Sequence, residues 1–153
     1  MVQEGQQFAT PEHSPRPMEM MGFMDALTSV FRNNYATISG RASRSEYWWS
    51  YLGTTIISMI AQIVGFGGAV ALLGVNESLA GLFMFIPIVA LLGLMIPTLA
   101  VSVRRMHDTG RSGWMMLIGI IPCIGIILLL VWFLDAGQPH VNAYGSVPTN
   151  KLE

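Results

Sequence analysis

Residues 104–114 read RRMHDTGRSGW, a short charged hinge between two long apolar runs. Five of its first eight side chains are ionisable. On either side of these eight positions lie more than twenty residues without Asp, Glu, Lys or Arg. A helix needs about 20 predominantly apolar residues to cross the hydrocarbon core of a bilayer, so each run is long enough to cross. We therefore expect a membrane span on both sides of the charged hinge.

The composition of the chain supports this interpretation. Hydrophobic residues make up 52% of the 153 positions and charged residues only 11%, whereas an ordinary soluble domain has about 25% charged residues. The net charge of −1 gives no reason to expect a nucleic-acid partner. The first apolar run begins only at Tyr47, behind a long polar segment, so we expect it to stay as an anchor rather than to be cleaved as a signal peptide. The chain is thus predicted to be an all-α integral membrane protein.

Three apolar runs predict three transmembrane helices, at about 47–74, 79–103 and 114–134. The third run is interrupted midway by Pro122, Cys123 and Gly125. This interruption leaves two architectures open: a single kinked crossing, or a re-entrant hairpin whose halves return to the same side. The single crossing is favoured, because turn backbone at the depth of the hydrocarbon is tolerated only where protein buries it.

The segments that flank the spans are more polar. Residues 1–21 contain three prolines and many polar side chains, which predicts a disordered tail. Apolar residues recur at helical spacing over 22–38, which predicts an N-terminal amphipathic helix. Such a helix lies either at the membrane surface or against the rest of the protein. The membrane domain is therefore taken as residues 22–148, with 149–153 as the C-terminal end.

Polar residues mark the start and the first half of the first span. Ser43 and Glu46 have the spacing of a capping box, in which each side chain accepts a hydrogen bond from the backbone N–H of the other, so the helix should begin near Arg44. Further along, polar residues four apart form one stripe on the helix. Such a stripe usually joins helices through interhelical hydrogen bonds, and the alternative is that it lines a substrate path. Its members are Ser50, Thr54, Ser58 and Gln62.

The distribution of basic residues orients the spans. Seven of the eight lie before the first span or in the charged hinge, and the loop around Glu77 has none. By the positive-inside rule, the N-terminus and the hinge face the cytoplasm. With three crossings, the tail after Asp135 would face the opposite side; with a re-entrant third run it would be cytoplasmic as well.

Three segments together resemble a known family. They are residues 40–48, which read GRASRSEYW, the charged hinge, and the tail motif Asn142-x-Tyr144-Gly145-x-x-Pro148. In combination they resemble the bacterial inner-membrane family catalogued as domain of unknown function 805. The resemblance covers about Phe31 to Pro148 and implies a small multi-pass protein of the bacterial cytoplasmic membrane, without an assigned biochemical function. The family tends to have Gly-Glu-Asn-Arg-Tyr-Gly in its tail where residues 140–145 here read HVNAYG, so part of any charged contact made by that tail would be lost.

The predicted topology gathers the ionisable side chains at the cytoplasmic membrane face. The candidate ligand-binding residues are Arg41, Arg44, Glu46, Arg104, Arg105, His107, Asp108 and Arg111. Because planar guanidinium groups suit bidentate contacts with phosphate, the expected partners are membrane lipids with anionic headgroups. A membrane-protein partner or a second copy of the chain is the other expectation. In the simpler interpretation, the arginines establish orientation and pair with the two acidic side chains.

The sequence gives no reason to expect an enzyme, a metal site or a cofactor. His107 and Asp108 are the only adjacent acid and base candidates, and neighbours on a helix point in different directions. The three histidines are scattered and no metal-ligand spacing recurs. A small oligomeric transporter or channel lined by the polar stripe is the alternative function. The spans contain none of the ionisable groups that ion-coupled carriers keep inside the membrane.

Overall fold

The computed structural model describes residues 20–148, and almost all of the predicted tail (1–21) and the whole C-terminal end (149–153) lie outside this part. Within the described residues the chain is helical, with turns and one isolated bridge between Asn142 and Gly145. The elements are α1 (Phe23–Thr28), the π-helical turn η1 (Ser29–Asn33), α2 (Arg44–Leu72), α3 (Glu77–Phe83), α4 (Phe85–Asp108), the 3₁₀ helix η2 (Gly113–Ile120) and α5 (Ile124–Leu134).

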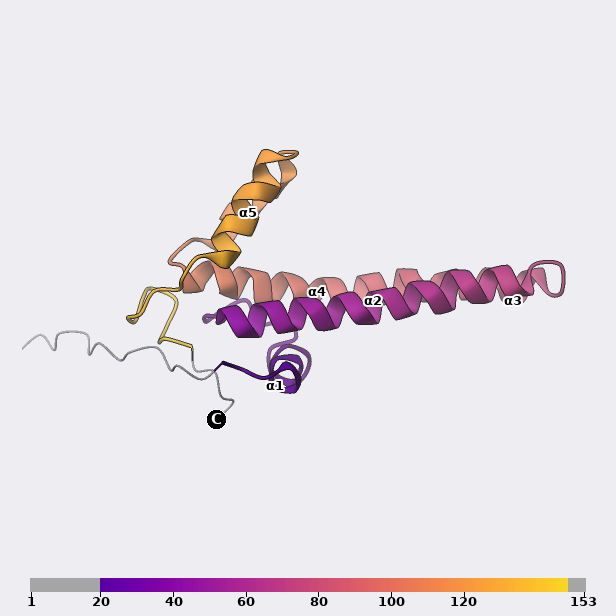
Figure 1. Ribbon diagram of the computed structural model, residues 1–153, viewed down its shortest axis with the longest axis horizontal. Helices are drawn as coiled ribbons and strands as arrows, with labels where there is room; N and C mark the ends of the chain where they lie inside the picture. Colours follow the sequence, from indigo (N-terminus) through magenta and orange to yellow (C-terminus); the bar gives the residue numbers. More distant parts are fainter. Residues whose placement is uncertain (1–19, 149–153) are drawn as a thin grey trace, which may run out of the picture.

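The dominant feature is a long hairpin in which α2 runs antiparallel to α3 and α4, while the remaining elements gather at one of its ends (Figure 1). Its two arms, Arg44–Leu72 and Glu77–Asp108, are long and apolar enough to cross a membrane, and most of their apolar surface faces outward. The 29 residues of α2 extend about 43 Å, close to the full thickness of a bilayer with its headgroup layers. The first two predicted spans therefore correspond to the long hairpin.

At the start of α2, one of the two hydrogen bonds of the predicted capping box is formed. The helix begins at Arg44, as expected, and the Ser43 hydroxyl accepts a hydrogen bond of 3.2 Å from the backbone N–H of Glu46. The carboxylate of Glu46 does not return to the backbone of Ser43. It accepts hydrogen bonds from Ser29 and Arg104 instead, because a buried carboxylate is stabilised more by a cation than by one backbone amide.

Close packing at the far end of the long hairpin depends on two glycines of α2. A Cβ at Gly65 would lie 2.4 Å from Cδ of Pro87, and one at Gly68 would lie 2.2 Å from the ring of Phe83. The helix continues through both glycines without a break. Small residues let membrane helices approach each other closely, so these glycines serve the packing of α2 on α3 and α4.

Pro97 lies inside α4 and leaves one carbonyl of the helix without its usual donor. The carbonyl in question is that of Gly93, four residues earlier. The hydroxyl of Tyr35 donates a hydrogen bond of 2.5 Å to this carbonyl oxygen. A backbone carbonyl without a partner is costly in a bilayer, so the loop after η1 stabilises the proline-containing helix.

The predicted third span is wrong, because residues 114–134 do not form one crossing. The run folds back on itself as an apolar hairpin of η2 and α5, which extends away from the long hairpin (Figure 1). Arg111 and Asp135, which flank the run, form an ion pair of 2.7 Å, so both of its ends lie at the same place. The run therefore has the hairpin shape of the second alternative that the sequence left open.

The two arms of the apolar hairpin have matched lengths although they differ in residue number. Eight residues of 3₁₀ helix and eleven of α-helix each extend about 16 Å, because the rise per residue is about 2.0 Å in the first and 1.5 Å in the second. This reach is about half of a hydrocarbon core of roughly 30 Å. The hairpin is therefore long enough to enter one leaflet and too short to cross both.

A tight turn and one glycine close the apolar hairpin. The backbone N–H of Ile124 donates a hydrogen bond of 2.7 Å to the carbonyl of Pro122, and Cys123 between them has φ 63° and ψ −62°. This is a γ-turn of the rarer, strained kind. A Cβ at Gly125 would lie 1.9 Å from the carbonyl oxygen of Ile118, so only glycine lets α5 approach η2 this closely.

The N-terminal helix is shorter than the predicted range of 22–38. Helical structure ends at Asn33, and α1 packs against α2, with Ala26 and Val30 fully buried. A Cβ at Gly53 of α2 would meet the Leu27 side chain at 2.3 Å. Of the two alternatives for this segment, contact with the rest of the protein is therefore observed.

Gly125, beside the closing turn of the apolar hairpin, gives a test of this architecture. We expect Gly125→Ala to lower the stability of the protein by about 1–3 kcal/mol, because the new methyl group overlaps the Ile118 carbonyl. Gly67→Ala, at an α2 position with open space around its Cβ, should be stabilising by up to about 1 kcal/mol. Thermal unfolding in detergent, followed by circular dichroism, measures both. Stabilisation by Gly125→Ala would instead indicate one continuous helix.

Candidate functional site

The ionisable residues converge where the end of α4 meets the start of α2. Arg104, Arg105 and Asp108 lie in the last turns of α4, so half of the predicted hinge is helix. After Asp108 the helix ends in a Schellman motif, in which Gly110, with φ 78°, and Arg111 donate backbone hydrogen bonds to the carbonyls of His107 and Met106. We call the five buried members of this cluster the arginine network: Arg41, Glu46, Arg104, Arg105 and Asp108.

Asp108 is the centre of the arginine network. Its side chain is completely buried, and its two oxygens bind different arginines. Oδ1 accepts hydrogen bonds from Nε and Nη2 of Arg41, at 3.1 and 2.9 Å, and Oδ2 accepts one from Nη1 of Arg105 at 2.5 Å. One carboxylate thus joins the loop before α2 to two positions in α4.

These two arginines also donate hydrogen bonds to backbone carbonyls at the end of α5 and in the C-terminal tail. Arg41 donates to the carbonyls of Gln138, His140 and Gly145, and Arg105 donates to those of Phe133 and Asp135. The prediction that the tail lies on the opposite side of the membrane from the hinge is therefore wrong. The apolar hairpin brings the chain back to the end of α4, and the two guanidinium groups bind the tail there.

A second buried pair links α2, α4 and η1. Nη1 of Arg104 donates to Oε1 of Glu46 at 2.8 Å, and the Ser29 hydroxyl donates to the same oxygen at 2.8 Å. Nε and Nη2 of Arg104 are buried without a hydrogen-bond partner in the described part of the chain. This pair holds the N-terminal segment on the long hairpin, with Arg104 less fully satisfied than Arg41 or Arg105.

Two other arginines of the candidate set lie at the surface. Arg111 is half-buried, forms its ion pair with Asp135 and lies over the ring of Trp132 at 5.2 Å. Arg44 is exposed at the first position of α2, and it has no hydrogen bond or ion pair within residues 20–148. Sequence reasoning missed Asp135 as a partner. The sequence feature that could have indicated this pairing is the position of Asp135 as the first charged residue after the third apolar run.

His107 points away from Asp108, as expected for neighbours on a helix. Its ring stacks on the ring of Tyr144, with centroids 3.9 Å apart, and its Nδ1 lies 3.1 Å from the carbonyl oxygen of Gly40. The Asn142 side chain donates a hydrogen bond of 2.9 Å to the carbonyl of His107. The tail motif therefore packs on the end of α4. Within the described residues there is no group of three or more His, Cys, Asp and Glu side chains that could hold a metal ion.

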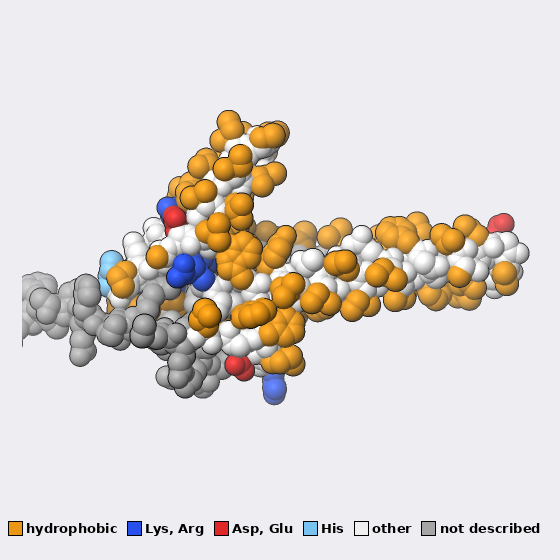
Figure 2. Space-filling model, viewed as in Figure 1, with side chains coloured by type: hydrophobic (Ala, Val, Ile, Leu, Met, Phe, Trp, Pro, Cys, Tyr) orange, Lys and Arg blue, Asp and Glu red, His pale blue; other side chains and the backbone are white. Residues whose placement is uncertain are grey.

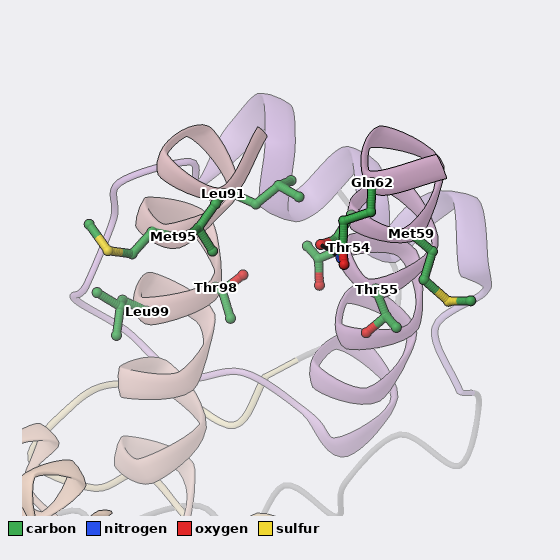
Figure 3. Close-up of a pocket in the computed structure, with 10 residues that line it drawn as sticks. Thr54, Thr55, Met59, Gln62, Leu91, Met95, Thr98 and Leu99 are labelled. Atoms are coloured by element: carbon green, nitrogen blue, oxygen red, sulfur yellow. Dashed lines mark hydrogen bonds between the residues drawn. The ribbon is translucent and has the colours of Figure 1, made fainter. Parts of the chain in front are cut away.

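The polar stripe of α2 is divided between two environments. Ser50 is fully buried, and its hydroxyl donates to the carbonyl of Glu46 beneath α1. Further along, the stripe lines an interhelical groove of about 390 Å³ between α2 and α4 (Figure 3). In this groove, Gln62 donates a hydrogen bond of 3.2 Å to Ser58. Thr98 lines the same groove from α4. The stripe thus forms a lateral groove, not a path that is continuous from Ser50.

Comparison with known proteins places the chain among membrane proteins. A family profile described as "Protein of unknown function (DUF805)" matches residues 35–146. Inner membrane protein YhaI of Escherichia coli (strain K12) is 38% identical over 116 residues, which are 75% of this chain and 88% of that protein. Inner membrane protein YhaH of the same strain is 33% identical over 137 residues, 85% of this chain and 99% of that protein. No solved structure matches the chain.

The buried carboxylate of Asp108 should be far more important for stability than the surface carboxylate of Asp135. We expect Asp108→Asn to cost about 3–5 kcal/mol, because it leaves two buried guanidinium groups without their counter-charge. Asp135→Asn, the matched control at the surface, should cost less than about 1 kcal/mol. Chemical unfolding in detergent measures both free energies. Equal effects of the two substitutions would contradict the central role of Asp108.

Proposed function

Because the chain belongs to the DUF805 family, whose Escherichia coli relatives YhaI and YhaH are inner membrane proteins, we propose that it is a non-enzymatic inner membrane protein. In this proposal it binds anionic lipid headgroups through a basic cytoplasmic face. The buried arginine network builds this face and the exposed arginines contact the lipid.

The proposed topology has two crossings, made by the arms of the long hairpin, with the apolar hairpin re-entrant in the cytoplasmic leaflet. In the view of Figure 2, hydrophobic side chains cover both hairpins, and the Lys and Arg side chains lie near the end of the long hairpin where α1 and the apolar hairpin are attached. At the far end the exposed Glu77 begins α3. The positive-inside rule then supports a cytoplasmic N-terminus and, because the tail binds Arg41 and Arg105, a cytoplasmic tail.

Cysteine labelling from each side of the membrane tests this topology. In a Cys123→Gly background, which removes the single cysteine, we expect Ala143→Cys to react with an impermeant maleimide only from the cytoplasmic side. Ser78→Cys, in the loop at the far end, should react only from the opposite side. Reaction of Ala143→Cys from the same side as Ser78→Cys would contradict the proposal and restore a third crossing.

The exposure of Arg44 is the observation that supports headgroup binding. Of the candidate residues, Arg41, Arg104 and Arg105 are almost completely buried and bound to acidic side chains or carbonyls. They are assigned a structural role. Arg44 is exposed at the first turn of a membrane helix, and Arg111 is partly exposed just after the end of α4. A basic side chain at this level gains about 1 kcal/mol from anionic lipid.

Native mass spectrometry with defined lipids tests the headgroup preference. In mixtures of phosphatidylglycerol and phosphatidylcholine with identical acyl chains, we expect the wild type to retain the anionic lipid preferentially. Arg44→Gln should reduce this preference about fivefold, the equivalent of about 1 kcal/mol. Arg44→Lys keeps the charge and serves as the control, so it should retain most of the preference. An unchanged preference in Arg44→Gln would contradict the proposal.

A small oligomeric transporter or channel is the second candidate, and the interhelical groove favours it. The groove places Ser58 and Gln62 on a lipid-facing side of a two-helix hairpin. Polar side chains in such positions usually bind another helix, since hydrocarbon offers no hydrogen-bond partner. Two crossings per chain are too few to enclose a pore, so this function needs several copies. The number of subunits in the native mass spectra tests this second candidate, because a monomer with two crossings cannot form a pore.

A further inference from the structure

A second space on the molecule lies between α4 and the apolar hairpin. This α4–η2 cleft has a volume of about 510 Å³, within the range of about 300–1,000 Å³ that is usual for small-molecule sites. Its walls are apolar, with Leu99 and Val103 of α4 on one side and Trp114 and Leu117 of η2 on the other. The cleft exists because the apolar hairpin diverges from the long hairpin instead of packing along it (Figure 1).

One end of the cleft is polar. His107, Ser112 and Tyr144 line it there, next to the Schellman end of α4. The opposite part is lined by Leu99, two helical turns further into α4. The cleft is therefore amphipathic along the direction of α4, with its polar end where the helix leaves the membrane. A molecule with a polar head and an acyl chain matches this arrangement.

The His107 ring determines which polar head fits. Its Nδ1 faces the carbonyl oxygen of Gly40, which only accepts hydrogen bonds, so Nδ1 carries the ring proton. In the neutral imidazole, Nε2 is then an acceptor. Nε2 lies beside Gly113, because a Cβ atom on Gly113 would be 3.5 Å from this nitrogen. Within residues 20–148, this nitrogen has no hydrogen-bond partner.

We propose that the α4–η2 cleft binds one phospholipid, with an acyl chain between α4 and η2 and a headgroup that donates a hydrogen bond to Nε2 of His107. Phosphatidylethanolamine has such a donor in its ammonium group, and phosphatidylcholine has none. The site contains neither Arg44 nor Arg111, so it is separate from the proposed binding of anionic headgroups. Stacking on Tyr144 holds the imidazole ring in the orientation that this contact requires.

Competition between two lipids of equal chain length tests this site. The purified full-length protein is equilibrated with dioleoyl phosphatidylethanolamine and dioleoyl phosphatidylcholine, and the retained lipid is read by native mass spectrometry. We expect the wild type to retain one phosphatidylethanolamine with about fivefold preference, the effect of one hydrogen bond. His107→Phe keeps an aromatic ring against Tyr144 but removes the acceptor, so it should abolish the preference.

A tryptophan in the cleft separates this site from general lipid binding. Leu117→Trp fills the cleft and should abolish retention of the single lipid. Leu130→Trp, at an exposed position of α5, is the matched control and should behave as the wild type. Equal retention of the two lipids by the wild type, or an unchanged preference in Leu117→Trp, would overturn the proposal. The preference for phosphatidylethanolamine over phosphatidylcholine should be abolished by Leu117→Trp and unaffected by Arg44→Gln, so the two proposals fail independently.

Discussion

The fold depends on a single buried carboxylate, that of Asp108. A charge removed from water is stabilised only by opposite charge and hydrogen bonds, and Asp108 receives both from Arg41 and Arg105. These two arginines also bind five carbonyls of residues 133–145. Three segments far apart in the sequence are thereby joined at one point: the loop before α2, the end of α4 and the tail.

The membrane imposes a second constraint, which is that every backbone polar group needs a partner inside the protein. At Pro97 and at the turn of the apolar hairpin, helical hydrogen bonding is broken and is compensated locally. The Gly93 carbonyl, released by Pro97, accepts a hydrogen bond from Tyr35. The turn around Cys123 is closed by the bond from Ile124 to Pro122, and Gly125 lets the two arms meet. At both positions a specific partner within the protein replaces the lost helical hydrogen bonding.

The five arginines of the candidate site divide into two groups with different roles. Those in the arginine network are surrounded by carboxylates and carbonyls, so they hold the fold and are unavailable to a ligand. Arg44 and Arg111 remain accessible at the same end of the molecule. The apolar hairpin is held at its base by this network and diverges from α4 beyond it. The same buried ion pairs therefore shape both the basic face and the α4–η2 cleft.

The sequence by itself determined the helical class, the two long spans, the start of α2 after the capping residue Ser43, and the family, because apolar run length, capping and local motifs are properties of neighbouring residues. All five residues of the arginine network were also predicted from the sequence to lie in one cluster. Only the tertiary structure decided the path of residues 114–134, since a 21-residue apolar run satisfies the length of one crossing or of two short arms equally well. The ion pair between Arg111 and Asp135 and the tail carbonyls bound by Arg41 select the hairpin. Such contacts join residues that are distant in the sequence, so a local sequence pattern does not predict them.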